Sequence, residues 1–324
     1  MPEMNLIQAV NATLDAMLGS DERVVVLGED VGKNGGVFRA TDGLFEKYGG
    51  DRVMDTPLAE SGIIGTSIGL AIGGLRPIAE IQFMGFLYPG LDQLISHAGR
   101  MAARSSGQVR VPLVVRVPYG GGIRAPEQHA DSAEAYLVHT PGLKVVVPST
   151  PYDAKGLLYA ALHDPDPVVF MEPIRLYRLG RQEVPEEAYI VPIGSARVVR
   201  EGTDISVVTW GNMVAVAERA ADALLGEASV EVIDLRSLFP LDREAIWRSV
   251  NKTGRAVVLQ EAPLTGGLGG EVTALIQDGA FWSLQAPVAR VAGPDIPYPP
   301  YAWEDMYLPS PERLLAAIRR TLQD

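Results

Sequence analysis

Residues 24–30 read Val-Val-Val-Leu-Gly-Glu-Asp, a short apolar run that ends in a glycine and two carboxylates. A run that is apolar at every position predicts a strand buried on both faces, as in a parallel sheet covered by helices. Before it, residues 6–18 place their apolar side chains at helical spacing and predict an amphipathic helix. The two segments together predict an α/β fold.

Alternation of helices and strands continues along the chain. Helical periodicity and short apolar runs predict helices around residues 60–74, 88–104 and 152–163, and strands around 78–81, 113–117, 144–147 and 168–170. Residues 173–192 are polar and without periodicity, and predicted strands resume around 205–209, 230–233, 256–259 and 288–291. This pattern is typical of mostly parallel sheets with helices on both faces.

The length of 324 residues indicates two domains, because single cores seldom grow beyond roughly 250–300 residues. The polar stretch between the two runs of alternation is the natural boundary. We expect a first domain over residues 1–175, a linker over 176–194 and a second, smaller α/β domain over 195–324.

Charge and composition exclude several classes of function. The formal net charge of −12 makes nucleic acid and anionic membranes unfavourable partners. The chain has no cysteine, which excludes disulfides, thiolate metal sites and cysteine nucleophiles. The first residues lack a signal-peptide pattern, and no apolar stretch approaches the roughly 20 residues of a membrane helix. We therefore expect a cytoplasmic protein.

Four polar segments, residues 28–39, 55–62, 79–86 and 118–132, lie near the ends of predicted strands. Ligands bind at the carboxyl ends of the strands in open parallel sheets, so these segments are candidates for a site. Each also has an ordinary structural explanation: a glutamate favours a helix start, phenylalanines fill cores, and a loop histidine bonds to the backbone. Phosphate-binding glycine motifs and paired histidines are missing from the sequence, and no residue is predicted to bind a metal.

At these segments the chain resembles a known family along essentially its whole length. It is similar to the β subunit of the thiamine-diphosphate-dependent decarboxylating component of 2-oxo acid dehydrogenase complexes. The stretches that carry the resemblance are Gly-Glu-Asp-Val-Gly at 28–32, Gly-Gly-Val-Phe-Arg at 35–39, Asp-Thr-Pro-Leu-Ala-Glu at 55–60, Ala-Glu-Ile-Gln-Phe at 79–83, Pro-Gly-Leu-Lys-Val-Val at 141–146, Asp-Ala-Lys-Gly-Leu at 153–157 and Val-Ile-Asp-Leu-Arg at 232–236.

The resemblance implies a transketolase-like pyrimidine-binding domain followed by a transketolase C-terminal domain. It implies an oxidoreductase that decarboxylates a 2-oxo acid and passes the acyl group to a lipoyl disulfide, with thiamine diphosphate as cofactor. Glu60 matches the glutamate that hydrogen-bonds the aminopyrimidine ring and activates the cofactor. The other matching positions are expected to line the pyrimidine pocket, and they are Glu29, Leu58, Ala59, Gln82 and Phe86.

His129 matches the active-site histidine of the family, which the resemblance places at proton transfer or charge stabilisation during acyl transfer. Together with Phe83, it is expected to meet the substrate. The chain has three other histidines, which are His97, His139 and His163. His97 falls inside a predicted helix, and the other two fall at predicted helix ends, so His129 is the expected catalytic imidazole.

The sequence contains no Gly-Asp-Gly segment, which enzymes of this class use to hold the diphosphate through Mg²⁺. The resemblance therefore implies half of an active site, with diphosphate and Mg²⁺ held by a separate α subunit. We expect an assembly of two α and two β chains that binds the lipoyl domain and the core of the dihydrolipoyl acyltransferase component.

The choice of substrate stays open at this point. Residues 172–178 and 261–267 resemble branched-chain members, whereas residues 129–132 and 148–153 resemble bacterial pyruvate members. The sequence favours a branched-chain 2-oxo acid, with pyruvate as the alternative. Half of a split transketolase-type enzyme is a further alternative, and a scaffold subunit that only docks the acyltransferase core is the non-enzyme alternative.

Overall fold

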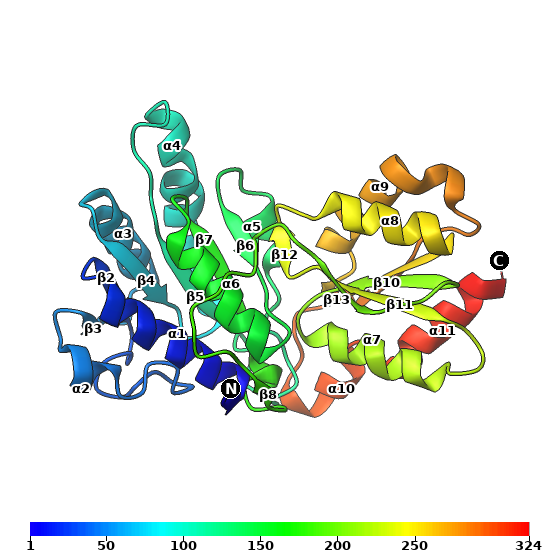
Figure 1. Ribbon diagram of the computed structural model, residues 1–324, viewed down its shortest axis with the longest axis horizontal. Helices are drawn as coiled ribbons and strands as arrows, with labels where there is room; N and C mark the ends of the chain where they lie inside the picture. The colour runs from blue at the N-terminus through cyan, green and yellow to red at the C-terminus, as the bar shows by residue number, and fades with distance from the viewer. Residues whose placement is uncertain (324) are drawn as a thin grey trace.

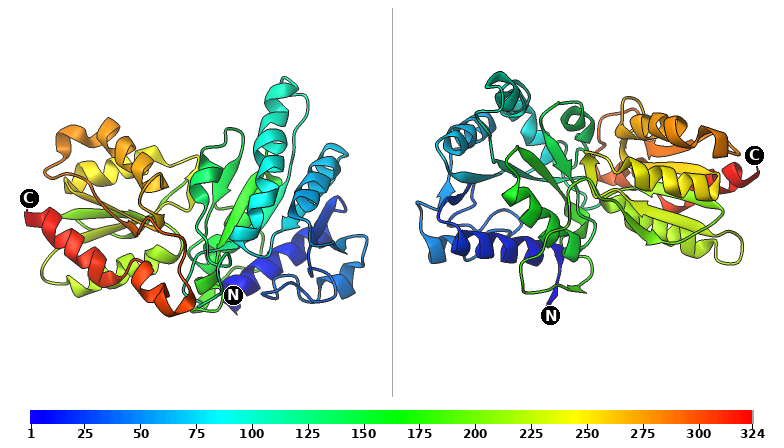
Figure 2. Two further views of the ribbon diagram at one scale, coloured as in Figure 1. Left: turned by 180° about the vertical axis from the view of Figure 1, so that it is seen from behind. Right: turned by 45° about the horizontal axis from the view of Figure 1, so that its top comes forward.

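The computed structural model describes residues 1–323, and it contains two α/β units that lie side by side (Figures 1 and 2). The first unit is built on a seven-stranded sheet in the order β12-β6-β7-β5-β4-β2-β3. Its strands are β2 (Val24–Gly28), β3 (Val53–Asp55), β4 (Arg76–Glu80), β5 (Val114–Tyr119), β6 (Lys144–Val146), β7 (Val168–Pro173) and β12 (Ser237–Phe239). All neighbouring pairs are parallel except β12 with β6.

The second unit is built on a five-stranded sheet in the order β14-β13-β10-β11-β9. Its strands are β9 (Arg197–Arg200), β10 (Ile205–Thr209), β11 (Val230–Asp234), β13 (Ala256–Pro263) and β14 (Ala289–Gly293). Only the edge pair of β9 with β11 is antiparallel. A small third sheet pairs β1 (Glu3–Met4) with β8 (Gln182–Glu183), so the polar stretch after β7 is fastened to the start of the chain.

Helices cover both faces of each sheet, as the alternation in the sequence predicts (Figure 1). In the first unit they are α1 (Leu6–Ser20), α2 (Leu44–Tyr48), α3 (Glu60–Ile72), α4 (Met101–Arg104), α5 (Glu134–Val138) and α6 (Pro151–His163). In the second unit they are α7 (Asn212–Ala223), α8 (Arg243–Thr253), α9 (Leu268–Ala280), α10 (Glu304–Tyr307) and α11 (Pro311–Gln323). No helix within residues 1–323 is long and apolar enough to cross a membrane.

The single helix predicted over residues 88–104 is not regular in the structure. It is replaced by 3-10 turns at η1 (Met84–Gly90), a π-helical turn at η2 (Gln93–His97), 3-10 turns at η3 (Ala98–Arg100) and the short α4. Pro89 has no backbone N–H to donate, which favours a tighter, broken path at this point. The remaining 3-10 turns are η4 (Ile174–Leu176), η5 (Phe281–Ser283) and η6 (Tyr301–Trp303).

The two units share one core. A continuous cluster of buried apolar side chains includes Ile63 of α3, Val117 of β5, Trp210 and Leu275 of α9. Strand β12 lies between the two units in Figure 1 and completes the sheet of the first unit with residues from the second half of the chain. The two units are therefore packed on each other and also joined by backbone hydrogen bonds.

Candidate functional site

The polar segments singled out in the sequence meet at one edge of the seven-stranded sheet. Strands β3, β2, β4 and β5 are neighbours and run parallel, so their carboxyl ends lie side by side. Glu29 directly follows β2, Glu60 begins α3 after β3, Gln82 follows β4, and His129 lies in the loop after β5. The structure thus brings all four segments to the edge where parallel sheets bind ligands.

We call Glu29 together with residues 58–60 the carboxylate rim. Glu60 is the first residue of α3, and the preceding residue, Ala59, offers no side-chain cap to the helix. The positive end of the helix dipole favours a negative charge at this position. Among residues 1–323, the Glu60 carboxylate has no hydrogen-bond or ion-pair partner, so it is free to bind a ligand.

Electrostatics set Glu29 apart from an ordinary surface carboxylate. Burial raises the pKa of the Glu29 carboxyl, and the nearby charges of Asp30 and Glu60 raise it further. Leu58 leaves 71% of its surface exposed. The rim therefore combines acidic and apolar side chains, and it is accessible from solvent.

The loop after β2 is held beside the rim by backbone donors. The amides of Gly32 and Lys33 donate to the two oxygens of the Asp55 carboxylate at 2.6 and 3.2 Å. The Gln82 amide nitrogen lies 3.5 Å from Asp30 Oδ2, at the limit of a hydrogen bond. These contacts join the ends of β2, β3 and β4, so Gln82 and the rim face the same space.

We call residues 120–132, which carry His129, the histidine loop. The His129 ring packs against Phe83 at 4.4 Å and against Phe86 at 4.9 Å between ring centroids. Its Nδ1 lies 2.9 Å from the Glu127 carbonyl oxygen, which can only accept, so Nδ1 carries the proton. In the neutral ring the lone pair is then on Nε2, which suits proton transfer.

A buried charge network lies beneath this edge and was missed in the sequence. The Arg116 guanidinium forms hydrogen bonds at 2.6 Å to Glu80 and at 2.6 and 2.9 Å to Glu172. The Tyr177 hydroxyl also donates to Glu172. Burial raises the pKa of the Glu80 carboxyl even against the charge of Arg116. The signal was available, because Glu80, Arg116 and Glu172 each interrupt a mostly apolar strand, in β4, β5 and β7.

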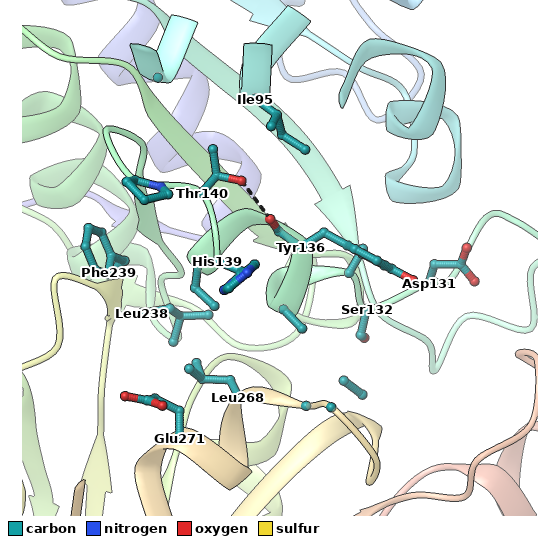
Figure 3. Close-up of a pocket in the computed structure, with 18 of the residues that line it drawn as sticks. Ile95, Asp131, Ser132, Tyr136, His139, Thr140, Leu238, Phe239, Leu268 and Glu271 are labelled. Carbon is teal, nitrogen blue, oxygen red and sulfur yellow. Dashed lines mark hydrogen bonds between the residues drawn. The ribbon is translucent and has the colours of Figure 1, made fainter. Parts of the chain in front are cut away.

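A cleft of about 1990 Å³ lies elsewhere (Figure 3). It runs between α5 and the second unit, where Tyr136, His139, Leu268 and Glu271 line its walls. None of the residues predicted to bind cofactor or substrate lines it, although the histidine loop borders it through Glu127 and neighbouring residues. We place the candidate site at the sheet edge, because the unpaired carboxylate and the aromatic side chains are there.

The edge suits the aminopyrimidine ring that the resemblance implies. Glu60 offers an unpaired carboxylate to a ring N–H, and Gln82 offers an amide that can both donate and accept. Phe83 and Phe86 offer aromatic surface, and Leu58 offers an exposed apolar side chain. The donor set therefore fits a flat, polar ring held at its rim.

Comparison with known families divides the chain in the same way. Residues 2–180 match the transketolase pyrimidine-binding domain, and residues 194–314 match the transketolase C-terminal domain. Among solved structures, a split-gene transketolase described as an inactive β4 tetramer superposes with a TM-score of 0.81, at 23% identity, over 99% of both chains. The transketolase from Leishmania mexicana gives a TM-score of 0.70 at 18% identity, over all of this chain and 46% of its own. These two likenesses establish the fold.

Curated relatives are much closer in sequence. The pyruvate dehydrogenase E1 component subunit beta of Bacillus subtilis is 52% identical over 324 residues, which is the full length of both chains. The protein of the same name from Acholeplasma laidlawii is 51% identical over 321 residues, covering 99% of this chain and 98% of its own. With two matching domains and half of its residues shared over the whole length, the chain belongs to the family of β subunits of the first, decarboxylating component of 2-oxo acid dehydrogenases.

Proposed function

We propose that this chain is the β subunit of a pyruvate dehydrogenase that uses thiamine diphosphate and acylates a lipoyl group. The carrying observation is the unpaired Glu60 carboxylate at the start of α3, beside Glu29 at the carboxyl edge of the sheet. The names of the relatives favour pyruvate, so the branched-chain preference inferred from residues 172–178 and 261–267 gives way to its alternative.

The proposed reaction balances without a further oxidant. When bound at this edge, thiamine diphosphate would supply the carbanion chemistry that removes carbon dioxide from the 2-oxo acid, and it would be regenerated when the acyl group leaves. The two-carbon fragment loses two electrons to a lipoyl disulfide, whose S–S bond breaks. One sulfur takes the acyl group as a thioester, and the other becomes a thiol by taking a proton.

The residues of the edge divide this work. Glu60 offers its carboxylate to share a proton with the pyrimidine ring, and Glu29 lies near enough for the two carboxylates to interact. Leu58, Ala59, Gln82 and Phe86 orient the ring. His129, with its Nε2 lone pair free, gives or takes a proton beside Phe83 during transfer to the lipoyl group.

A second chain is part of this proposal. The exposed rim fits a site that an α subunit closes, with Mg²⁺ and the diphosphate held by that subunit. The expected assembly contains two α and two β chains, works in the cytoplasm, and delivers acyl groups to the lipoyl domain of an acyltransferase core. The domain limits at residues 175 and 195 are part of the same proposal.

Reconstitution tests the shared site. We expect the chain alone to bind thiamine diphosphate weakly in calorimetry and to release no carbon dioxide from pyruvate. Mixed with a candidate α chain that carries the Gly-Asp-Gly segment, the chain should gain both activities. Decarboxylation by the chain alone would contradict the shared site.

Substrate choice is tested in the same mixture. Rates of carbon dioxide release with pyruvate and with 3-methyl-2-oxobutanoate should differ in favour of pyruvate. A higher kcat/KM for the branched substrate would restore the branched-chain assignment. Transfer of a two-carbon ketol unit between sugar phosphates, with no release of carbon dioxide, would favour a split transketolase instead.

A further inference from the structure

The histidine loop is fastened by residues that lie far away in the sequence. The Gly121 amide donates to the carboxylate of Glu261, at the end of β13. The Arg124 amide donates to both oxygens of Glu304, at 3.1 Å for Oε2 and 3.3 Å for Oε1. Both glutamates belong to the C-terminal domain. This domain therefore holds the backbone of the N-terminal domain at two positions that precede His129 in the chain.

Glu304 is central to this contact between the domains. It is the first residue of α10 and leaves only 1% of its surface exposed. Its Oε2 also accepts a hydrogen bond of 2.8 Å from the Tyr298 hydroxyl. That hydroxyl lies so close to Gly121 that a methyl group on this glycine would overlap it. A buried carboxylate that accepts from two fixed donors holds both of them in one place.

The far side of the histidine is held by the same segment. Ala130, directly after His129, is fully buried, and it forms a small cluster with Tyr298, Tyr307 and Leu308. Residues 298–308 therefore hold the histidine loop on both sides of His129, by hydrogen bonds before it and by apolar packing after it.

The N-terminal domain makes a different kind of contact with the loop. Phe83 and Phe86 pack against the His129 ring, and the Tyr88 hydroxyl donates to Asp131 at 2.9 Å. The aromatic contacts restrict the tilt of the ring, but they would allow it to slide along the phenylalanine surfaces. The hydrogen bonds that the loop amides donate to Glu261 and Glu304 hold the backbone itself, so they fix how far the loop reaches over the edge.

We propose that the C-terminal domain sets the position of His129 over the reaction site, with Glu304 as the positioning residue. The proposal rests on the function proposed for His129. It gives the C-terminal domain a part in acyl transfer, because a misplacement of about 1 Å in a reacting group costs up to about a hundredfold in rate.

The test compares variants of the complex reconstituted with the α chain. Glu304→Ala removes the acceptor, and Tyr298→Phe removes one donor while keeping the volume. The matched control is Glu231→Gln, because Glu231 is also 1% exposed in the C-terminal domain but bonds to Gly202 and Lys252, away from the histidine loop. His129→Ala is measured in parallel.

Two readouts separate positioning from general stability. The first is amide hydrogen exchange of residues 120–132. The second is the ratio of lipoyl-domain acetylation to pyruvate-dependent reduction of ferricyanide, which follows decarboxylation without the lipoyl group. In Glu304→Ala, loop exchange should rise about tenfold and the ratio should fall about tenfold or more. Tyr298→Phe should show smaller changes in the same direction, and Glu231→Gln should show neither.

Each outcome decides a separate point. Equal loop exchange in Glu304→Ala and Glu231→Gln would show that Glu304 does not hold the loop. A fall of lipoyl-domain acetylation and ferricyanide reduction by the same factor would give Glu304 a structural role only. If Glu304→Ala does not assemble, Tyr298→Phe decides by the same two readouts. An unchanged ratio in His129→Ala would contradict the proposed function of the histidine. Loop exchange alone would then decide whether Glu304 holds the histidine loop.

Discussion

The carboxylate rim and the histidine loop lie at the same edge of the sheet, but they are built in opposite ways. The rim has an unpaired Glu60 and a Leu58 that is mostly exposed. The histidine loop is bonded at Gly121 and Arg124 and buried at Ala130. The rim is left for a ligand and a partner to complete, whereas the loop is already fixed by the chain itself. Changes at the rim should therefore affect activity, and changes in the buried supports should also affect stability.

The largest expected effect is at the rim. Glu60→Gln removes the carboxylate that shares a proton with the cofactor, and we expect carbon dioxide release by the reconstituted complex to fall by about 10²–10⁴-fold. Because Glu60 has no partner within the described chain, the unfolding midpoint should stay at the wild-type value. Glu46→Gln, an exposed carboxylate in the first turn of α2, is the matched control and should keep full activity. Near-normal turnover by Glu60→Gln would end the proposed role.

A change in the buried network of Arg116, Glu80 and Glu172 should instead lower the stability of the fold. Arg116→Met leaves Glu80 and Glu172 buried without a counter-charge, and we expect it to lower the free energy of unfolding by about 3–5 kcal/mol. Denaturant unfolding of the full chain measures this. Arg23→Met, which breaks an exposed pair with Asp21, should leave the curve in place. A small loss in Arg116→Met would contradict the need of this buried pair of carboxylates for a counter-charge.

The pH dependence of stability gives a third test. Burial raises the pKa of Glu134 from its ordinary 4.5 to about 7, and neither of its oxygens has a partner within the described residues. The folded state therefore holds this proton more tightly than the unfolded state. The stabilising contribution is complete below pH 4.5 and is lost as the pH rises to about 7, at a cost on the order of 3 kcal/mol.

Glu134→Gln should remove that part of the pH dependence. Its unfolding midpoint, followed from pH 4.5 to pH 8, should decline less than that of the wild type and should be the higher of the two at pH 8. Parallel curves for the two proteins would mean that Glu134 keeps its charge without cost, which would contradict its burial.

The smallest effect is expected at Leu58. Leu58→Ala should change the free energy of unfolding by less than about 0.5 kcal/mol, because the side chain is mostly exposed. In the reconstituted complex it should raise the thiamine diphosphate concentration for half-maximal activity roughly tenfold, since apolar contact with the ring is lost. If the thiamine diphosphate concentration for half-maximal activity stays unchanged, Leu58 does not belong to the cofactor site. The part of the rim that binds the cofactor would then be its two glutamates.

The sequence allowed the α/β class to be predicted because its buried strands are apolar at every position, as in residues 24–27. It also placed Glu29, Glu60, Gln82 and His129 near strand ends, and parallel pairing then brought them together. Both features depend on short-range patterns. The regular helix over residues 88–104 was wrong because local geometry at Pro89 overrides the periodicity of the side chains.

Contacts between distant residues could not be predicted in this way. The bond from Gly121 to Glu261 joins residues 140 positions apart, and the bond from Arg124 to Glu304 joins residues 180 apart. Glu304 lies in no stretch singled out from the sequence, and Glu261 was noted only as the start of residues 261–267. The contact that each glutamate makes with the histidine loop exists only when the two units are packed together. Likewise, residues 237–239 are too short to stand out as a strand, and their partner lies in the other unit.

The pairing of β12 with β6 has a consequence for how this chain can be divided. A cut in the polar stretch after β7 would separate two sequences that each match a domain family. It would also strip β12 from the larger sheet and leave β6 as a bare edge, with its backbone donors and acceptors open to other chains. The N-terminal piece expressed alone would then be prone to aggregate through that edge, so fragments that keep residues 237–239 are the safer choice for expression.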